Sequence, residues 1–387
     1  METLGLTAAQ IQAGGASWTA REIAQQPRLW PEVARLVAAD AGLTTFLAPL
    51  LANPLMRVVL TGAGTSSFIG ECLAPALSRK TGRRVAAIPS TDIVSCPESC
   101  LLAHTPTLMV HFARSGNSPE SVAAMELAEQ LIEHCAHLIM TCNGEGALYR
   151  RAGAMRQAHA VLLPEASNDR SFAMTSSFTG MLLAAAGALQ VLGVDEGHSA
   201  RLARLGTRVM ESSVALLPGL VHPGFERVVY LGSNEFKGLA REAALKMLEL
   251  TDGAVASIAD SPLGFRHGPK TILNGSTLVV VFLSNDAHTR RYDSDLLTEL
   301  RRDAVAGRVF ALGSRAEGGE HAETMVLGDD AAPLSDLELC LPYAVFAQAL
   351  AMRRSLALGL SPDNPNAAGT VNRVVQGVTI YPYGGQR

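Results

Sequence analysis

Short runs of apolar residues recur along the chain, and each is followed by a polar turn and then by a helical pattern. The runs begin near residues 57, 107 and 138 in the first half and near residues 227, 277 and 308 in the second half. Continuous apolar runs of about five residues are typical of strands that are buried on both faces of a parallel sheet. The order of strand, turn, helix and strand predicts right-handed βαβ units, and therefore an α/β fold with doubly wound sheets of the flavodoxin-like kind.

The three runs of the first half reappear in the second half with a constant offset of 170 residues. The segment 57–62 (RVVLTG) corresponds to 227–232 (RVVYLG), and the other two pairs keep the same spacing. Three runs in register predict that the chain contains two copies of one α/β unit. The predicted organisation is an N-terminal helical extension, a first copy, a second copy and a C-terminal tail: 1–55, 56–205, 206–360 and 361–387.

The two ends of the chain lie outside this repeat. Thr19 has the character of a helix start, and the amphipathic pattern continues from Trp30 to Leu51 with a break expected near Pro49. The β-branched residues of 374–381 suggest a short final segment that packs back onto a domain.

Composition excludes several classes of protein. The chain of 387 residues is 48% hydrophobic and 18% charged, with a formal net charge of -4, which argues against a nucleic-acid-binding protein. No apolar run reaches the roughly 18 residues of a membrane span, and the first residues lack the features of a signal peptide. Cys96 and Cys100 have no cluster of histidines near them in the sequence, so no metal site is expected. We expect a cytoplasmic protein with no membrane or nucleic-acid partner.

The turn after the first strand, 61–67, has the chemistry of a phosphate site. Gly64 permits close approach of the backbone, Thr65 and Ser66 supply hydroxyl groups, and the helix that follows presents its amino end. The turn is neither a Walker A loop nor a dinucleotide fingerprint. A nicotinamide-dependent enzyme nevertheless stays an alternative, because Asp92 could be the acid that binds the ribose. The alternative is an ordinary glycine turn in which hydroxyl groups cap the helix.

The turn after the next strand, 113–121, carries Arg114, Ser115 and Ser118. A helix cap accounts for Ser118 and the proline after it, but not for an arginine beside a serine, a combination that can clamp a phosphate. The corresponding turns of the second half carry Glu235 and Asp286, which would repel phosphate. Anion binding is therefore expected in the first half alone.

The predicted helix at 241–250 places Glu242, Lys246 and Glu249 on one face. Such a face is often a solvated row of ion pairs. Here, however, lysine is scarce (four in the chain, against 28 arginines), and the neighbouring alanines suggest close packing. A carboxylate beside a positive group on a partly buried face is a plausible proton shuttle. Farther along, His267 lies in a rigid Gly-Pro turn that could present an imidazole to a ligand, or could hold an ordinary surface histidine.

These motifs together resemble a known family. Both halves resemble sugar isomerase (SIS) domains, which bind phosphosugars, and the tandem is similar to the isomerase half of glucosamine-6-phosphate synthase. Within that group, four segments look like the galactosamine-6-phosphate deaminase/isomerase branch, often labelled tagatose-6-phosphate ketose/aldose isomerase: 19–27, 113–121, 171–179 and 369–377.

The resemblance implies a role for each candidate residue. Glu249 matches the carboxylate that moves a proton between C1 and C2, and His267 matches a histidine that assists ring opening in the neighbouring subunit, which implies a homodimer. Glu242 and Lys246 complete the catalytic face, where Lys246 would stabilise an oxyanion and tune Glu249. No metal or organic cofactor is implied. The phosphosugar-binding positions are Gly64, Thr65, Ser66, Arg114, Ser115 and Ser118.

One departure from the synthase bears on the reaction. The synthase uses a C-terminal lysine to form an imine with its keto sugar, whereas this chain has no lysine after Lys270, and Arg373 is a poor nucleophile. The resemblance therefore favours a substrate that already carries its nitrogen: deamination and isomerisation of an amino-hexose 6-phosphate, with D-galactosamine 6-phosphate giving D-tagatose 6-phosphate and ammonia. Two alternatives are aldose-ketose isomerisation without deamination and a non-catalytic phosphosugar sensor.

Overall fold

The computed structural model describes residues 2–222, 224–316, 323–375 and 377–384. It contains two five-stranded sheets in which every neighbouring pair of strands is parallel. The first sheet has the order β4 (Val85–Ala87), β3 (Arg57–Thr61), β5 (Thr107–Ala113), β6 (Cys135–Thr141), β7 (Ala158–Leu162). The second has the order β9 (Ala256–Asp260), β8 (Arg227–Gly232), β10 (Thr277–Phe282), β11 (Arg308–Gly313), β12 (Thr324–Val326).

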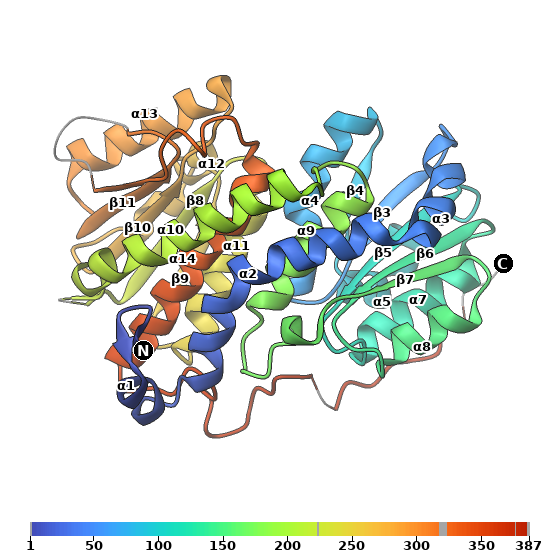
Figure 1. Ribbon diagram of the computed structural model, residues 1–387, viewed down its shortest axis with the longest axis horizontal. Coiled ribbons are helices and arrows are strands. Elements are labelled where there is room, and N and C mark those ends of the chain that lie inside the picture. The colour runs from blue at the N-terminus through green and yellow to red at the C-terminus, as the bar shows by residue number, and fades with distance from the viewer. Residues whose placement is uncertain (1, 223, 317–322, 376, 385–387) are drawn as a thin grey trace.

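The two sheets confirm the repeat that the sequence predicts. Their strands follow the same order, and β3 and β5 correspond to β8 and β10 at an offset of 170 residues. One continuous core fills the space between the sheets, and it includes Val58 and Leu60 from the first sheet and Val228 and Tyr230 from the second. Figure 1 shows the sheets on opposite sides of the molecule with helices between them.

The helices lie in the central layer, on the outer faces of the sheets and at the N-terminus. The central layer comprises α2 (Ser17–Ala39), α4 (Thr65–Thr81), α9 (Ser176–Ala188), α10 (Glu196–Val221), α11 (Glu235–Leu250) and α14 (Asp336–Ala357). The outer elements are α5 (Ser90–Ser95), α6 (Pro97–Cys100), α7 (Pro119–Leu131) and α8 (Ala147–Ala154) on the first sheet, and α12 (Pro262–Phe265), η2 (Pro269–Ile272) and α13 (Ala287–Asp303) on the second. The remaining elements are β1 (Glu2–Thr3), β2 (Leu6–Thr7), α1 (Ala8–Ala13), α3 (Ala41–Ala52) and η1 (Glu165–Ser167).

The N-terminal extension differs from its predicted form. Helix α2 begins at Ser17, and its first free N–H groups, those of Trp18 and Thr19, donate to the Asp363 carboxylate at 3.0 and 2.8 Å. The break falls at Asp40, because the side chain of Asp40 accepts from the N–H of Leu43 and starts α3, which continues through Pro49. A cap from the distant tail is not visible in the local sequence.

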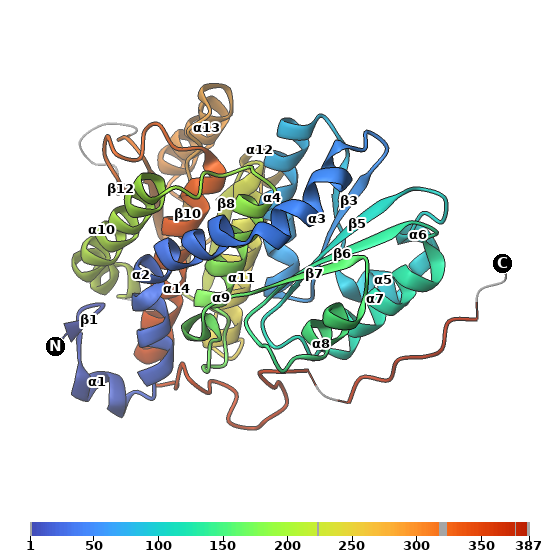
Figure 2. The ribbon, with the colours of Figure 1, turned by 45° about the vertical axis from the view of Figure 1, so that its right-hand side comes forward.

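Helix α10 runs without interruption through residues 205 and 206, the predicted boundary between the two copies. It packs against α2 and α14. In the described part of the tail, no regular element forms between residues 374 and 381, and the chain runs extended past both halves, as Figures 1 and 2 show. No single described helix is long and apolar enough to span a membrane. Together α2 and α3, bent by 69°, would pass that test on length and composition only.

Helices α4 and α11 occupy corresponding places in the two halves and pack against each other at the centre of the molecule. Arg241 on α11 forms an ion pair with Glu71 on α4, and these two positions are themselves separated by 170 residues. Gly238 lets the backbones approach closely, because a Cβ at that position would lie 2.6 Å from the Cys72 nitrogen. The first half therefore meets the second through corresponding surfaces.

Gly62, which follows β3, and Gly232, the last residue of β8, are expected to disfavour a side chain for the same steric reason. A Cβ at Gly62 would lie 2.7 Å from the Ser66 carbonyl carbon, and one at Gly232 would lie 2.5 Å from the Phe236 oxygen. Both Gly62→Ala and Gly232→Ala should lower the free energy of unfolding by about 1–3 kcal/mol, measured by denaturant titration. Gly153→Ala, on a helix with no atom within 4 Å, is the matched control and should be neutral or slightly stabilising. Equal behaviour of all three variants would contradict the steric argument.

Candidate active site

The carboxyl ends of β3 and β5 lie side by side and bring the two hydroxyl-rich turns together. Thr61 is the register partner of His111, so the turn at 61–67 and the turn that starts at Arg114 leave the same edge of the sheet. Gly64 adopts a φ of +56°, and an added Cβ would meet no atom within 4 Å. The surface beside this glycine is therefore open, which suits close approach of a ligand to the backbone.

Lys246 joins this turn to the second half. Its side chain is completely buried, and its Nζ donates to Thr65 Oγ1 at 2.8 Å and also to Glu249. Thr65 is the first residue of α4, whereas both charged residues belong to α11. The α4–α11 contact thus places the predicted catalytic face beside the predicted phosphate turn. Because Lys246 is completely buried, this face is not a solvated row of ion pairs.

The two carboxylates of the face differ in their environments. The Glu249 side chain keeps 26% of its surface exposed, whereas that of Glu242 keeps 2%. The Lys246 nitrogen lies 3.6 Å from the nearer Glu242 oxygen, and neither oxygen of Glu242 has a hydrogen-bond partner within the described residues. Burial, opposed by Lys246, raises the pKa of Glu242 to about 8. At pH 7 the face therefore pairs a neutral acid with a charged lysine, and Glu249 is the member that a ligand can reach.

Arg114 is buried at the same place and is held by backbone carbonyls. Its guanidinium donates to the Arg373 oxygen at 2.7 Å and to the Phe172 oxygen at 3.5 Å. Burial and the nearby Arg373 lower the pKa of Arg114, while Asp169 and Glu249 act in the opposite direction; the group still carries its charge at neutral pH. A fixed positive charge close to Glu249 can hold an anionic substrate in place.

The serines of the two turns have their own local contacts. Ser118 is the N-cap of α7, but its hydroxyl donates to Ser121 at 2.6 Å and makes no capping bond. The Ser115 carbonyl accepts from the Asn143 side chain at 2.8 Å, and Ser66 Oγ lies 3.8 Å from the sulfur of Met174. Met174 belongs to the loop 168–174, so that loop reaches the first turn.

Sequence reasoning missed Asp169, which organises this loop. It is fully buried, and its carboxylate accepts from the backbone N–H groups of Thr175, Ser176 and Ser177 at 2.7–3.0 Å. The Arg373 side chain from the tail donates to the Asp169 carbonyl. An aspartate six residues before a run of three hydroxyl residues is the one local signal that could have identified it.

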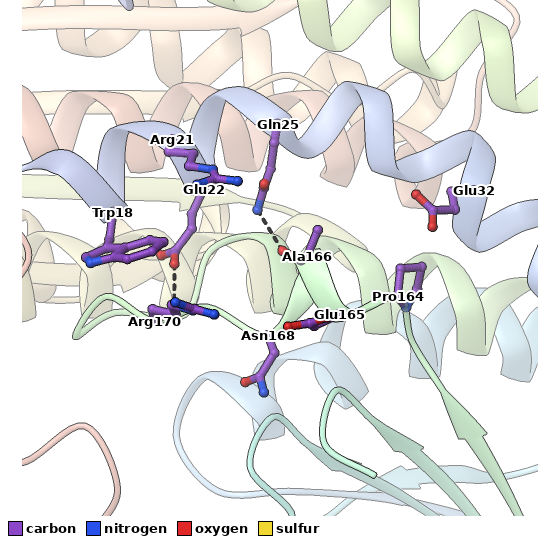
Figure 3. Close-up of a pocket in the computed structure, with 10 residues that line it drawn as sticks. All are labelled: Trp18, Arg21, Glu22, Gln25, Glu32, Pro164, Glu165, Ala166, Asn168 and Arg170. Atoms are coloured by element: carbon purple, nitrogen blue, oxygen red, sulfur yellow. Dashed lines mark hydrogen bonds between the residues drawn. The ribbon is translucent and has the colours of Figure 1, made fainter. Parts of the chain in front are cut away.

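A surface pocket of about 440 Å³ lies on the other side of the same loop. Figure 3 shows it between α2, which contributes Glu22 and Gln25, and the segment from Pro164 to Arg170. Glu22 accepts from the N–H groups of Arg170 and Ser171, and burial together with Asp169 raises the pKa of Glu22 to about 7. None of the predicted site residues lines this pocket. The contacts of Glu22 hold the loop on this side.

His267 lies away from Glu249 within one chain. Its turn is fastened to α13, because Arg266 and Lys270 both bond to Glu299, and Phe265 packs in the core between α13 and the second sheet. Helix α11 covers the opposite face of that sheet. The His267 side chain is exposed to solvent. The sheet therefore separates the two residues, and a single chain does not bring them together.

The raised pKa of Glu242 leads to a prediction about stability. Between about pH 4.5 and pH 8 the folded chain holds a proton that the unfolded chain releases, so this carboxyl makes the folded state less stable as the pH rises through that window. Glu242→Gln removes the titration. The melting temperature of the variant relative to the unaltered chain should therefore rise with pH across the window, measured by thermal unfolding. A difference that stays constant with pH would contradict the assignment.

Comparisons with known proteins identify the family of this chain. The SIS domain family matches residues 50–189. A Streptomyces coelicolor protein that carries the AgaS name is 52% identical, covering 94% of this chain and 95% of its own length. D-galactosamine-6-phosphate deaminase AgaS of Escherichia coli O157:H7 is 44% identical over 96% of this chain and 97% of its own.

A solved structure extends the likeness to the fold. The crystal structure of tagatose-6-phosphate ketose/aldose isomerase from Escherichia coli superposes with a TM-score of 0.89 at 41% identity, covering 96% of this chain and 98% of that one. Identity at this level over nearly the full length of both chains shows that this chain and these relatives belong to one family. This chain belongs to the AgaS family of SIS-domain enzymes.

Proposed function

We propose that the chain converts D-galactosamine 6-phosphate into D-tagatose 6-phosphate and ammonia. The observation that carries this proposal is the position of Glu249, which is reachable from solvent, paired with a buried lysine and adjacent to the turn at 61–67. The substrate is taken from the names of relatives at 42% to 52% identity. A base held beside an anion-binding turn is the arrangement that proton transfer on a phosphorylated sugar requires.

The phosphate is proposed to bind between the two turns of the first half. Backbone N–H groups at the amino ends of α4 and α7 and the charge of Arg114 favour an anion there. With the phosphate fixed, C1 and C2 at the other end of the sugar come within reach of Glu249. The proposed binding residues are Gly64, Thr65, Ser66, Arg114, Ser115 and Ser118.

The reaction is then a proton transfer followed by hydrolysis. Glu249 takes the C2 proton of the open-chain amino-aldose while the aldehyde oxygen gains a proton, which gives an enaminol. Return of the proton to C1, with loss of one from nitrogen, gives a ketimine. Water adds to the C=N bond, and ammonia leaves as the keto sugar forms. Every step is acid-base chemistry that carboxylates, an imidazole and water can perform.

Lys246 and Glu242 are proposed to support Glu249. The complete burial of Lys246 favours a role in tuning and positioning Glu249 over direct contact with a substrate oxyanion. Glu242, with a pKa near 8, can remain neutral so that the buried ammonium is balanced by one carboxylate instead of two. This division keeps Glu249 available as the base.

His267 is proposed to open the sugar ring in the site of a second subunit. It is exposed, and it lies across the second sheet from the Glu249 of its own chain. A homodimer in which each site takes Glu249 from one chain and His267 from its partner would resolve this separation. The partners of the chain are thus its phosphosugar and a second copy of itself. We place this hydrolytic deaminase in the cytoplasm, where sugar phosphates are metabolised.

A second candidate is aldose-ketose isomerisation without release of nitrogen. It uses the same residues, and the Escherichia coli structure at 41% identity is described as a ketose/aldose isomerase. The two activities differ in one product, because ammonia forms only when the substrate carries an amino group at C2. Substrate identity therefore decides between them.

The direct test is ammonia release from D-galactosamine 6-phosphate. The unaltered chain should release one ammonia for each keto sugar formed, and Glu249→Gln should lower kcat by about 10²–10⁴-fold, the usual contribution of a general base. Glu126→Gln, which removes a carboxylate from a surface pair with Arg151, is the matched control and should keep full activity. Coupled ammonia detection gives the rates.

Different outcomes reject different parts of the proposal. Turnover of a keto-hexose phosphate without any ammonia from amino sugars would favour the isomerase. Near-normal turnover by a folded Glu249→Gln variant would remove Glu249 from the mechanism.

Mixing two inactive variants tests the shared site. Glu249→Gln and His267→Ala should each be nearly inactive alone. After random exchange in an equal mixture, about half of the dimers are mixed, and each mixed dimer holds one intact site out of two. About a quarter of the unaltered activity should therefore return. Retained activity in His267→Ala alone, or no recovery after exchange has been confirmed by native mass spectrometry, would overturn the shared-site assignment.

A further inference from the structure

Three potential metal ligands meet at the far end of the first sheet from Glu249. Cys135 is the first residue of β6, His137 follows two residues later on the same face, and Glu129 lies near the end of α7. Their ligand atoms all lie within 4.8 Å of one another. His137 Nε2 is 3.3 Å from Cys135 Sγ and 2.7 Å from a Glu129 oxygen.

We propose that Glu129, Cys135 and His137 bind one Zn²⁺ ion, with water as the fourth ligand. Zinc takes thiolate, imidazole and carboxylate ligands at about 2.0–2.3 Å, and a tetrahedral site separates its ligand atoms by roughly 3.3–3.7 Å. The Cys135–His137 distance already falls in this range. The Glu129 side chain is 46% exposed and on the helix surface, so it can open by the remaining half ångström.

The surroundings of His137 suit a metal ligand. Its Nδ1 lies 2.9 Å from Nε2 of His111 on the neighbouring strand, and both rings are buried and stacked. When Nε2 binds a metal, the ring hydrogen must sit on Nδ1 and needs an acceptor, which Nε2 of His111 supplies.

Charge and access fit a divalent cation. Binding releases the thiol proton of Cys135 and forms one S–Zn bond, so a thiolate and a carboxylate balance the two positive charges while imidazole stays neutral. The exposed Glu129 gives the ion a path from solvent. The bound ion would fasten the C-terminal end of α7 to the start of β6. The N-terminal end of the same helix carries Ser118, one of the proposed phosphate-binding residues. This inference does not depend on the proposed reaction.

Cobalt substitution tests the site with a readout that requires the thiolate. The full chain, stripped with a chelator, should bind one Co²⁺ and develop a sulfur-to-cobalt charge-transfer absorption in the near ultraviolet, which one equivalent of Zn²⁺ then abolishes. Zn²⁺ should also raise the melting temperature. Cys135→Ser should abolish the absorption, and Glu129→Gln, a surface change that should fold normally, should weaken Co²⁺ binding at least tenfold.

The remaining thiols provide the control. A Cys96→Ser/Cys100→Ser double variant removes the other two cysteines that are not fully buried and should keep both the absorption and the affinity. The proposal is overturned if the unaltered chain binds no stoichiometric Co²⁺, if the absorption survives Cys135→Ser, or if the double variant loses it. Circular dichroism establishes that each variant is folded.

Discussion

The buried ammonium group of Lys246 is the interaction on which the arrangement of the molecule depends. A charge without solvent must find partners inside the protein, and removing one partner from such a group costs about 3–5 kcal/mol. Lys246 finds Thr65 in the first half and the carboxylates of its own helix in the second. A shift of the two halves along the α4–α11 contact would break the Lys246–Thr65 hydrogen bond and leave a buried ammonium with one partner fewer, so this bond holds the base and the phosphate turn in a fixed relation.

The tail and the loop 168–174 complete the site from outside that contact. Arg373 uses its carbonyl to hold Arg114 and its guanidinium to hold the Asp169 backbone, while Asp363 caps α2. Glu22 holds the same loop from the opposite side. Segments that are 148 and 204 residues away from the loop in the sequence thus meet around it, and both hold it through hydrogen bonds to its backbone groups.

The local pattern of apolar and polar residues predicted the central strands and the proposed catalytic helix face. Apolar runs such as 107–112 and 277–282 became strands β5 and β10, which occupy corresponding places in the two sheets, and the spacing of Glu242, Lys246 and Glu249 became one helix face. The cap from Asp363 depends on a contact that no short window contains, whereas the break at Asp40 and the anchor at Asp169 are local contacts that the apolar pattern does not report. The cluster around His137 is also local in the sequence, but it was missed because Glu129 comes from a different element and the stretch lacks a familiar metal-binding spacing.

The pairing of Glu71 with Arg241 has a consequence for how the molecule can change. Two separate, identical chains joined across a twofold axis must present the same residues at both ends of their interface. Here one chain supplies both ends, and the positions that correspond to Thr65 and Glu249 hold Glu235 and Arg79, which form their own ion pair. At the second end of the contact, Arg79 thus stands in the place of the base Glu249, and Glu235 stands in the place of the hydroxyl residue Thr65. Joining the copies in one polypeptide made this asymmetry possible, because each end could then vary without altering the other.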